Sequence, residues 1–298
     1  MPRIALAICF LAVPALAQPV LLGVTAGGDV YRIDALSGGA TLVGSSGVGA
    51  NAAASDASGR LFTGGGNADQ IIEIDPATGA GSVWLTTTGR PAGYGIRGMA
   101  FDGAGGLFVI LSQADTQAID TLARIDLASG AYTVIGPTGR TDIQDLAIGP
   151  SGALYGVGIL GGGELYQINT GTGVATVIGG GSLGNDTQAL AFAADGSLFA
   201  ARANLLRVDP SSAAATVVGA TGVADFRGMA FVGATAACYA NCDDSTTQPV
   251  LNVLDFNCFL NRFAAGEARA NCDGSTTIPA LNVLDFVCFL NRFAAGCP

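Results

Sequence analysis

Two short segments near the C-terminus carry oxygen-bearing side chains at alternate positions, as a metal-binding loop requires. The first set is Asn241, Asp243 and Ser245, and the second is Asn271, Asp273 and Ser275. Alternate spacing lets a curling loop direct every second side chain at one ion. A second pair of oxygen-bearing residues follows each loop: Asn252 with Asp255, and Asn282 with Asp285. Calcium is a hard cation that prefers about six to eight oxygen ligands, so we expect two calcium ions here.

The two loops belong to a duplicated unit. Residues 241–266 read NCDDSTTQPVLNVLDFNCFLNRFAAG, and residues 271–296 read NCDGSTTIPALNVLDFVCFLNRFAAG. The pattern predicts a polar loop and then an amphipathic helix in each unit. The loop is about three residues longer than an EF-hand loop, begins with Asn and ends with Asp rather than Glu. Fewer charges predict an affinity suited to extracellular calcium. The alternative is an acidic capped turn that holds no ion.

The ends of the two units are also distinctive. The helices end in Leu260-Asn261-Arg262-Phe263 and Leu290-Asn291-Arg292-Phe293, and the chain ends in Gly296-Cys297-Pro298. Together with the loops and cysteines, these features resemble the GC-type dockerin domain of secreted bacterial proteins, over residues 238–298. The resemblance implies a docking role, with a cohesin-like or cell-surface protein as partner and Asn261, Arg262, Asn291 and Arg292 as candidate contacts. Solubilising helix-end residues are the alternative, and the longer loop sets the unit apart from cellulosomal dockerins.

Six cysteines lie in this module: Cys238, Cys242, Cys258, Cys272, Cys288 and Cys297. An even number of clustered cysteines in an exported protein indicates disulfides. The symmetry of the units favours Cys242–Cys258 and Cys272–Cys288, with Cys238–Cys297 joining the ends, among about fifteen possible pairings. A module of about sixty residues buries little core, so cross-links are expected to stabilise it.

The N-terminus has the features of a secretory leader. A positive start at residues 1–3 precedes an apolar run, and Ala15-Leu16-Ala17 supplies small residues for cleavage before Gln18. We therefore expect a signal peptide at residues 1–17 and a secreted, extracellular or cell-surface protein. No apolar stretch is long enough to predict a transmembrane segment.

Several chemistries are excluded by composition. The chain has no histidine and no lysine, which removes histidine general bases and Schiff-base lysines. A net charge of −10 without a basic patch argues against nucleic acid as a partner. Most acids in the body of the chain fall at turn positions, so we expect no enzyme activity.

The body of the chain is a repeat. An apolar residue, Asp or Asn and a downstream Gly recur at Ile33-Asp34, Ile74-Asp75, Ile125-Asp126 and Ile168-Asn169, with a degenerate copy at Val208-Asp209 followed by Ala213. The period of about 40 to 50 residues is that of a four-stranded propeller blade. We predict a mainly β fold, a five-bladed β-propeller over residues 18–235, with six or seven blades or an open solenoid as alternatives, and a small α-helical module over residues 236–298.

The two ends of the repeat region are complementary. Residues 20–44 contain three strands of a blade, whereas residues 224–234 contain only an opening strand. Joining them completes the fifth blade and closes the ring, which removes exposed sheet edges. We expect this C-terminal strand to close a monomeric propeller.

Polar residues recur at one position of the strands expected to line the central channel. Aligned on Met99, Leu146, Leu190 and Met229, the copies place there Asn51, Arg97, Gln144, Gln188 and Arg227. Two arginines predict an anionic or carbohydrate ligand at one channel mouth, and simple hydration is the alternative. We therefore expect a non-enzymatic binding or display protein attached through its C-terminal module. An extracellular carbohydrate-active propeller enzyme anchored by the same module is the alternative.

Overall fold

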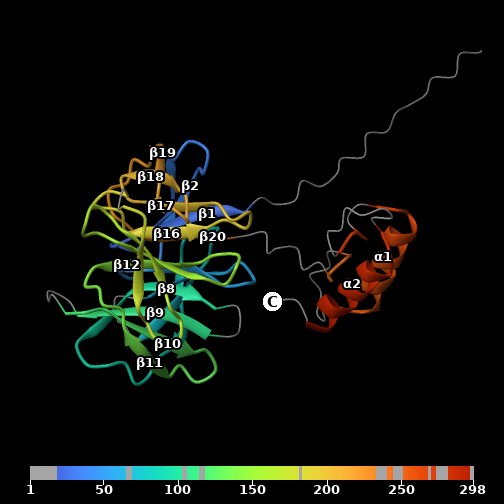
Figure 1. The fold of residues 1–298 in the computed structure, drawn as a ribbon, viewed down its shortest axis with the longest axis horizontal. Coiled ribbons are helices and arrows are strands. Elements are labelled where there is room, and N and C mark those ends of the chain that lie inside the picture. Colours follow the sequence, from blue (N-terminus) through green and yellow to red (C-terminus); the bar gives the residue numbers. More distant parts are fainter. Residues whose placement is uncertain are drawn as a thin grey trace, which may run out of the picture.

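The computed structural model describes residues 19–64, 69–102, 106–113, 118–180, 183–232, 240–243, 251–267, 270–272 and 281–295. Five antiparallel four-stranded sheets form the larger part, and two helices form the smaller part (Figure 1). The prediction of a mainly β, five-bladed propeller with a small helical module is confirmed. Neither described helix is long and apolar enough to cross a membrane.

Each blade contains four strands, which follow one another from the centre of the ring outward. The closing blade consists of β20 (Phe226–Val232), β1 (Val20–Thr25), β2 (Asp29–Ile33) and β3 (Ala40–Ser45). The next blade consists of β4 (Ala53–Ser55), β5 (Leu61–Gly64), β6 (Gln70–Ile74) and β7 (Gly81–Thr86). The third consists of β8 (Tyr94–Phe101), β9 (Gly106–Gln113), β10 (Thr121–Asp126) and β11 (Tyr132–Pro137).

The last two blades complete the ring. One consists of β12 (Ile143–Ile148), β13 (Leu154–Gly158), β14 (Leu165–Ile168) and β15 (Ala175–Ile178). The other consists of β16 (Ala189–Phe192), β17 (Leu198–Ala201), β18 (Asn204–Val208) and β19 (Ala215–Ala220). The inner strands lie side by side in the order β20, β4, β8, β12, β16 and back to β20. The circle is therefore closed.

The closing blade joins the two ends of the repeat region as predicted. β20 pairs antiparallel with β1, with Val232 opposite Val20 and Met229 opposite Gly23. A strand from the end of the region thus becomes the inner strand of the blade that begins it. This pairing uses the free edge of β1, which would otherwise lack hydrogen-bond partners.

The recurring Asp or Asn shapes the turn between the third and fourth strands of each blade. In the first copy, Asp34 Oδ1 accepts hydrogen bonds from the backbone N–H groups of Leu36 and Ser37, at 2.8 and 3.3 Å. The Leu36 N–H, as the largest cause, lowers the pKa of Asp34. The glycine that follows adopts a left-handed conformation, with φ of 82° at Gly38. These acids therefore have a structural role, as expected from their positions.

The degenerate copy keeps this turn at a conformational cost. Ala213 takes the place of the glycine, with φ of 58°, and it is the one non-glycine residue with positive φ among those described. An alanine Cβ makes this conformation unfavourable. The surrounding hydrogen bonds hold it, since Ala213 N–H donates to the Asp209 carbonyl at 2.8 Å.

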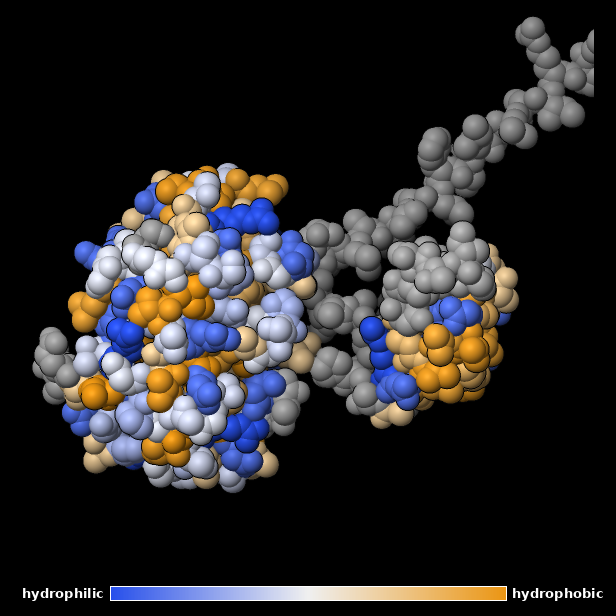
Figure 2. Space-filling model, in the orientation of Figure 1, coloured by the Kyte–Doolittle hydropathy of each residue, from blue (hydrophilic) through white to orange (hydrophobic). Residues whose placement is uncertain are grey.

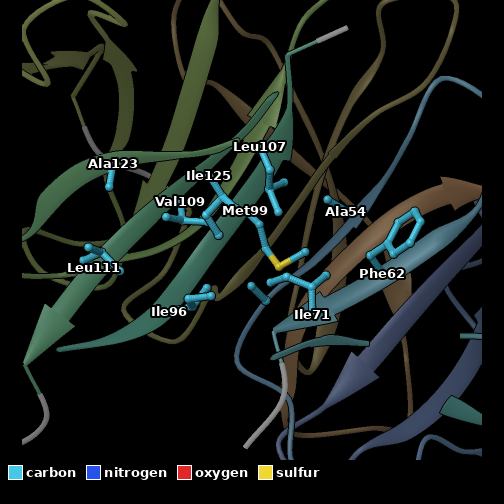
Figure 3. Packing of buried hydrophobic residues seen from close by; sticks show 11 residues of the cluster. Ala54, Phe62, Ile71, Ile96, Met99, Leu107, Val109, Leu111, Ala123 and Ile125 are labelled. Carbon is cyan, nitrogen blue, oxygen red and sulfur yellow. The ribbon is translucent and has the colours of Figure 1, made fainter. Parts of the chain in front are cut away.

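The hydrophobic core is divided into five clusters, each formed between neighbouring blades. Figure 3 shows the cluster between the β4–β7 and β8–β11 blades, where Phe62 and Ile71 lie near Met99 and Leu107. Successive side chains of a strand point to opposite faces of the sheet, so that Leu198 enters one cluster and Phe199 the next. Burial between blades therefore makes each sheet depend on both of its neighbours.

The helical module has a small core of its own. Helix α1 (Val253–Ala264) and helix α2 (Val283–Ala295) lie within the two repeat units. Phe259 and Phe289 stack with ring centroids 4.2 Å apart and planes 11° apart, and both are fully buried or nearly so. Two equivalent helices thus pack through the same residue of each repeat.

Candidate functional site

The polar residues predicted to ring one channel mouth begin the inner strands, but they fall into separate groups. Arg97 and Gln144 come from adjacent blades and contact each other, with 3.2 Å between Arg97 Nη1 and Gln144 Oε1. Arg227 donates instead to Asp225 Oδ1 at 3.0 Å, and Arg202 lies 3.6 Å from the same oxygen. Gln188 is buried with no hydrogen-bond partner for its Oε1, and Asn51 is exposed.

A group of acids that the sequence pattern did not reveal lies beside Arg97 and Gln144. Asp120 is fully buried, and its Oδ2 accepts the Ile143 N–H at 2.9 Å. Its other oxygen, Oδ1, has no hydrogen-bond partner. Burial raises the pKa of Asp120 to about 6, and hydrogen bonds from the Ser112 side chain and the Ile143 N–H oppose that rise. This carboxyl therefore titrates closer to neutrality than an ordinary aspartate.

Two further acids share one tyrosine next to this position. The Tyr166 hydroxyl lies 2.6 Å from Glu164 Oε2 and 3.2 Å from Asp142 Oδ1. Burial and the Glu164 hydrogen bond raise the pKa of Tyr166, so it stays protonated as a donor. Arg140 lies over the Tyr166 ring at 5.0 Å and 3.6 Å from Glu164 Oε2. The start of the β12–β15 blade thus carries a connected polar network.

The central channel is narrow. A cavity of about 100 Å³ is lined by the later residues of the inner strands, including Ala54, Ala100, Ala147, Ala191 and Ala230. None of the five predicted ring residues lines it. The predicted ligand position therefore lies outside this cavity, toward the beginnings of the inner strands.

Asp145 lies among the inner strands and is completely buried. Its Oδ1 accepts the Leu146 N–H and its Oδ2 accepts the Leu190 N–H, both at 2.9 Å. The N–H groups of Met229 and Met99 also donate to this carboxylate. Burial raises the pKa of Asp145, and the four backbone donors oppose that shift. Because every partner is a donor, both oxygens of the Asp145 carboxyl act as acceptors at this position.

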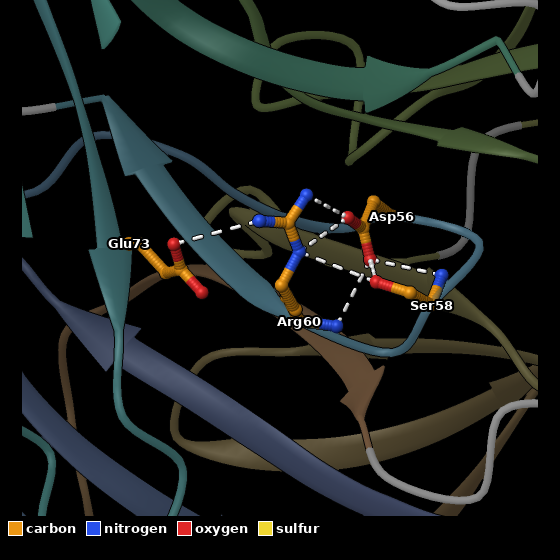
Figure 4. A network of polar contacts seen from close by, with 4 residues as sticks. All are labelled: Asp56, Ser58, Arg60 and Glu73. Atoms are coloured by element: carbon orange, nitrogen blue, oxygen red, sulfur yellow. Dashed lines mark hydrogen bonds and ion pairs between the residues drawn. The ribbon is translucent and has the colours of Figure 1, made fainter. Parts of the chain in front are cut away.

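Other acids of the propeller are engaged in ordinary surface pairs. Asp102 Oδ2 lies 2.6 Å from Arg124 Nη2, and Asp186 is exposed. Figure 4 shows Arg60 between Asp56 and Glu73, at 2.7 and 3.6 Å. Ion pairs with arginine therefore account for Asp56, Glu73 and Asp102.

The predicted calcium ligands are described only in part. Ser245, Asp273 and Ser275 lie outside the described residues. In the first unit, Asp255 is fully buried, and its oxygens accept the N–H groups of Asn252 at 2.9 Å and Asp243 at 3.2 Å. The start of the loop and the start of the helix therefore meet at Asp255. Asn252 Oδ1 also caps α1 by accepting the Leu254 N–H at 2.8 Å.

The second unit repeats this geometry. Asp285 is fully buried and accepts the Asn282 N–H at 2.8 Å, while Asn282 Oδ1 accepts the Leu284 N–H at 2.8 Å. Asn241 and Asn271 begin the two loops. Among the described residues, no group of three or more His, Cys, Asp or Glu side chains is arranged so that it could hold a metal ion by itself. The donor set of amide and carboxylate oxygens fits a hard cation, and a calcium site here would depend on amide, hydroxyl and carbonyl oxygens as well.

Two disulfides join the loops to the helices. Cys242 bonds to Cys258 and Cys272 bonds to Cys288, each across 16 residues. These are the two predicted pairs within the units. The predicted pair Cys238–Cys297 lies outside the described residues. Each cross-link fixes the residues just after the first loop ligand against its own helix.

The outer surface of the two helices is apolar. Val253 and Val283 are 68% and 69% exposed, and Leu254 and Leu284 are 58% and 59% exposed. Leu260 and Leu290 are also exposed, and Figure 2 shows an apolar surface over this module. Asn261 and Asn291 are exposed beside it. Arg262 lies 3.8 Å from Glu267, and Arg292 donates to the Cys272 carbonyl at 3.5 Å.

Comparisons with known proteins support the propeller fold and do not indicate an activity. No protein-family model matches the sequence, and no curated protein matches it. A solved symmetrical protein, described in a study of its de novo evolutionary emergence under folding constraints, is 19% identical with a TM-score of 0.51, over 72% of this chain and 100% of that one. A chain of a nidogen/laminin complex is 16% identical, with a TM-score of 0.49 over 72% and 83%. The first likeness supports the propeller fold alone.

Proposed function

We propose that this chain is a secreted, non-enzymatic binding or display protein whose propeller is attached to an extracellular or cell-surface partner through the helical module. The chain combines a rigid closed ring with a small cross-linked module that has an apolar outer surface. The leader-like residues 1–17 and the two disulfides support an oxidising, extracellular setting.

The observation that carries the docking role is the repetition of exposed apolar residues at equivalent helix positions. The helices bury phenylalanines against each other and still expose Val253, Leu254 and Leu260, matched by Val283, Leu284 and Leu290. A contiguous exposed apolar surface is unfavourable in water and typical of a protein interface. The partner is expected to be a cohesin-like or other cell-surface protein with a complementary apolar face.

Calcium would order the loops that carry this surface. In both units the first apolar contact residue directly follows Asn252 or Asn282, which begins the helix. An ion held by the loop oxygens would therefore fix the position of the exposed valine and leucine. At ten times its dissociation constant, each ion would stabilise the module by about 1.4 kcal/mol.

Docking is tested with the secreted full chain immobilised on a surface. Extracellular and cell-surface proteins of the source cells are passed over it in calcium and then in a chelator. We expect a partner that is retained only in calcium and is lost from the double variant Leu254→Asp/Leu284→Asp. Leu42→Asp, at an exposed position on β3, is the matched control and should retain the partner. Equal retention by all variants would contradict the proposal.

A second site for an anionic or carbohydrate ligand is proposed at the channel mouth, around Arg97 and Gln144. The contact between Arg97 and Gln144, which come from adjacent blades, supports it. The variant Arg97→Ala should lower the affinity for acidic oligosaccharides by at least about tenfold, equivalent to about 1.4 kcal/mol. An unchanged affinity would contradict the proposal of a ligand site at this position.

A carbohydrate-active enzyme is the second candidate, favoured by the carboxyls Asp120, Asp142 and Glu164 near one mouth. Hydrolysis needs two carboxyls placed on either side of a sugar linkage. Release of reducing sugar from polysaccharides by the wild type, and its loss in Glu164→Gln, would establish this candidate. No turnover in either protein supports the binding role.

A further inference from the structure

The axis of the propeller is lined by strand edges that have no strand partner. Each inner strand pairs with the second strand of its own blade on one side only. The N–H groups on its other side face the neighbouring inner strands, where Leu146, Leu190 and Met229 are nearly inaccessible to water. Buried backbone N–H groups almost always have an acceptor. These strands therefore need an acceptor at the axis.

One side chain supplies that acceptor. The Asp145 carboxylate receives N–H groups from β12 through Leu146, from β16 through Leu190, from β20 through Met229 and from β8 through Met99. These four donors occupy the equivalent position in four different blades. A concave set of backbone N–H groups is a general binding site for anions.

The space at the axis holds only one carboxyl side chain, because the residues equivalent to Asp145 in the other blades are small. They are Ala52, Gly98, Ala189 and Gly228. A Cβ at Gly98 would lie 2.8 Å from the Asp145 Cα, and one at Gly228 would lie 2.1 Å from the Ala53 nitrogen. A second carboxylate at this level would also repel the first. The position thus combines four small residues with a single carboxyl side chain.

We propose that the fivefold axis is an anion-binding site made of backbone N–H groups, and that the Asp145 side chain is its built-in carboxylate ligand. The site binds a small monovalent carboxylate, and the chain provides it covalently. Removal of the side chain leaves the donors in place, with a space that a free formate ion fills. This inference is independent of the docking role of the helical module.

The test uses the full chain with Asp145→Ala. Trp84 is the single tryptophan and lies in β7, so its fluorescence reports on the propeller. We expect the variant to melt about 10 °C below the wild type. Sodium formate should restore at least half of that loss in a saturable manner. Pivalate at the same ionic strength should not, because its tert-butyl group is too bulky for the space.

Asp186→Ala is the matched control, since it removes an exposed carboxylate near the start of the adjacent inner strand. It should melt like the wild type and show no specific response to formate. Equal effects of formate and pivalate on Asp145→Ala, or a variant as stable as the wild type, would overturn the proposal.

Hydrogen exchange of the wild type provides a second measurement in case Asp145→Ala does not fold. The N–H groups of Leu190, Met99 and Met229 should exchange only with global unfolding. Exchange at the rate of surface turns would show that Asp145 does not hold them and would also overturn the proposal.

Discussion

The propeller and the helical module solve the same stability problem in different ways. The propeller distributes its core over five interfaces between blades and closes the ring by pairing β20 with β1. The module has one phenylalanine core, two disulfides and an apolar outer surface. A ring can satisfy its strand edges internally, whereas a two-helix module is too small to do without cross-links. The module nevertheless leaves apolar side chains exposed that it could have buried, which is consistent with an interaction surface.

Reduction of the two disulfides should have the largest effect. Each cross-link of this length stabilises the module by about 3 kcal/mol, so Cys242→Ala with Cys272→Ala should unfold the module. Helical circular dichroism would fall because the described helices belong to the module, while Trp84 fluorescence would still show the propeller melting at the wild-type temperature. A simultaneous loss of both signals would show instead that the two regions depend on each other for stability.

A single methyl group at the axis should weaken the propeller alone. In Gly228→Ala the new Cβ would lie 2.1 Å from the backbone nitrogen of Ala53, so two inner strands must separate. We expect a loss of about 3 kcal/mol in unfolding free energy, measured by denaturant titration of Trp84 fluorescence. Gly180→Ala, where nothing lies within 4 Å, is the control and should be nearly neutral. Similar losses in both variants would rule out close packing at the axis as the cause.

The buried Asp120 should make the stability of the propeller depend on pH. Its pKa is about 6 in the folded protein, against an ordinary aspartate value of 3.8, so the folded state holds the proton more tightly than the unfolded chain. This contribution to stability is present below about pH 4 and is lost as the pH rises through about 6. From about pH 4.5 to about pH 7.5 the wild type should lose about 2 kcal/mol relative to Asp120→Asn. A pH-independent difference between the wild type and Asp120→Asn would contradict this assignment.

The smallest expected effect concerns the degenerate turn. Ala213→Gly relieves the positive φ of an alanine and should stabilise the propeller by about 1 kcal/mol. Ala214→Gly, one residue later, gains no such relief and should not stabilise. The melting temperature of the propeller measures both. A destabilised Ala213→Gly would show that burial of the methyl group outweighs the strain.

Local rules explain why much of the fold was predictable from the sequence. The repeated Asp and Gly residues specify turns through side-chain hydrogen bonds and positive φ, as at Asp34 and Gly38. The unmatched strand at residues 226–232 predicted the closure, because an unpaired edge demands a partner. The pairing of Cys242 with Cys258 followed from the duplication of the unit.

The environment of the candidate sites was less predictable. Arg97, Gln188 and Arg227 occupy the same position in their repeats, but their surroundings differ. Arg97 contacts Gln144, Gln188 is buried, and Arg227 pairs with Asp225. Asp120 comes from a different strand connection, so spacing gave no sign of it. The sequence does distinguish Asp145, because it is the single acid at a position where the other copies have Gly or Ala. Its role as a hydrogen-bond acceptor could not be predicted, because that role depends on distances between blades.

The closing strand also determines how the molecule would respond to tension. The module follows β20 in the chain, and β20 ends at Val232, directly opposite Val20 at the start of β1. A pulling force on an anchored module would therefore act on the Val232–Val20 pair first and on the Phe231–Leu21 pair afterwards. Hydrogen bonds pulled one at a time yield at low force, whereas the same bonds loaded together resist. The pairing that completes the ring at equilibrium would thus be the first to open under load, so the closing blade sets the mechanical strength of the propeller.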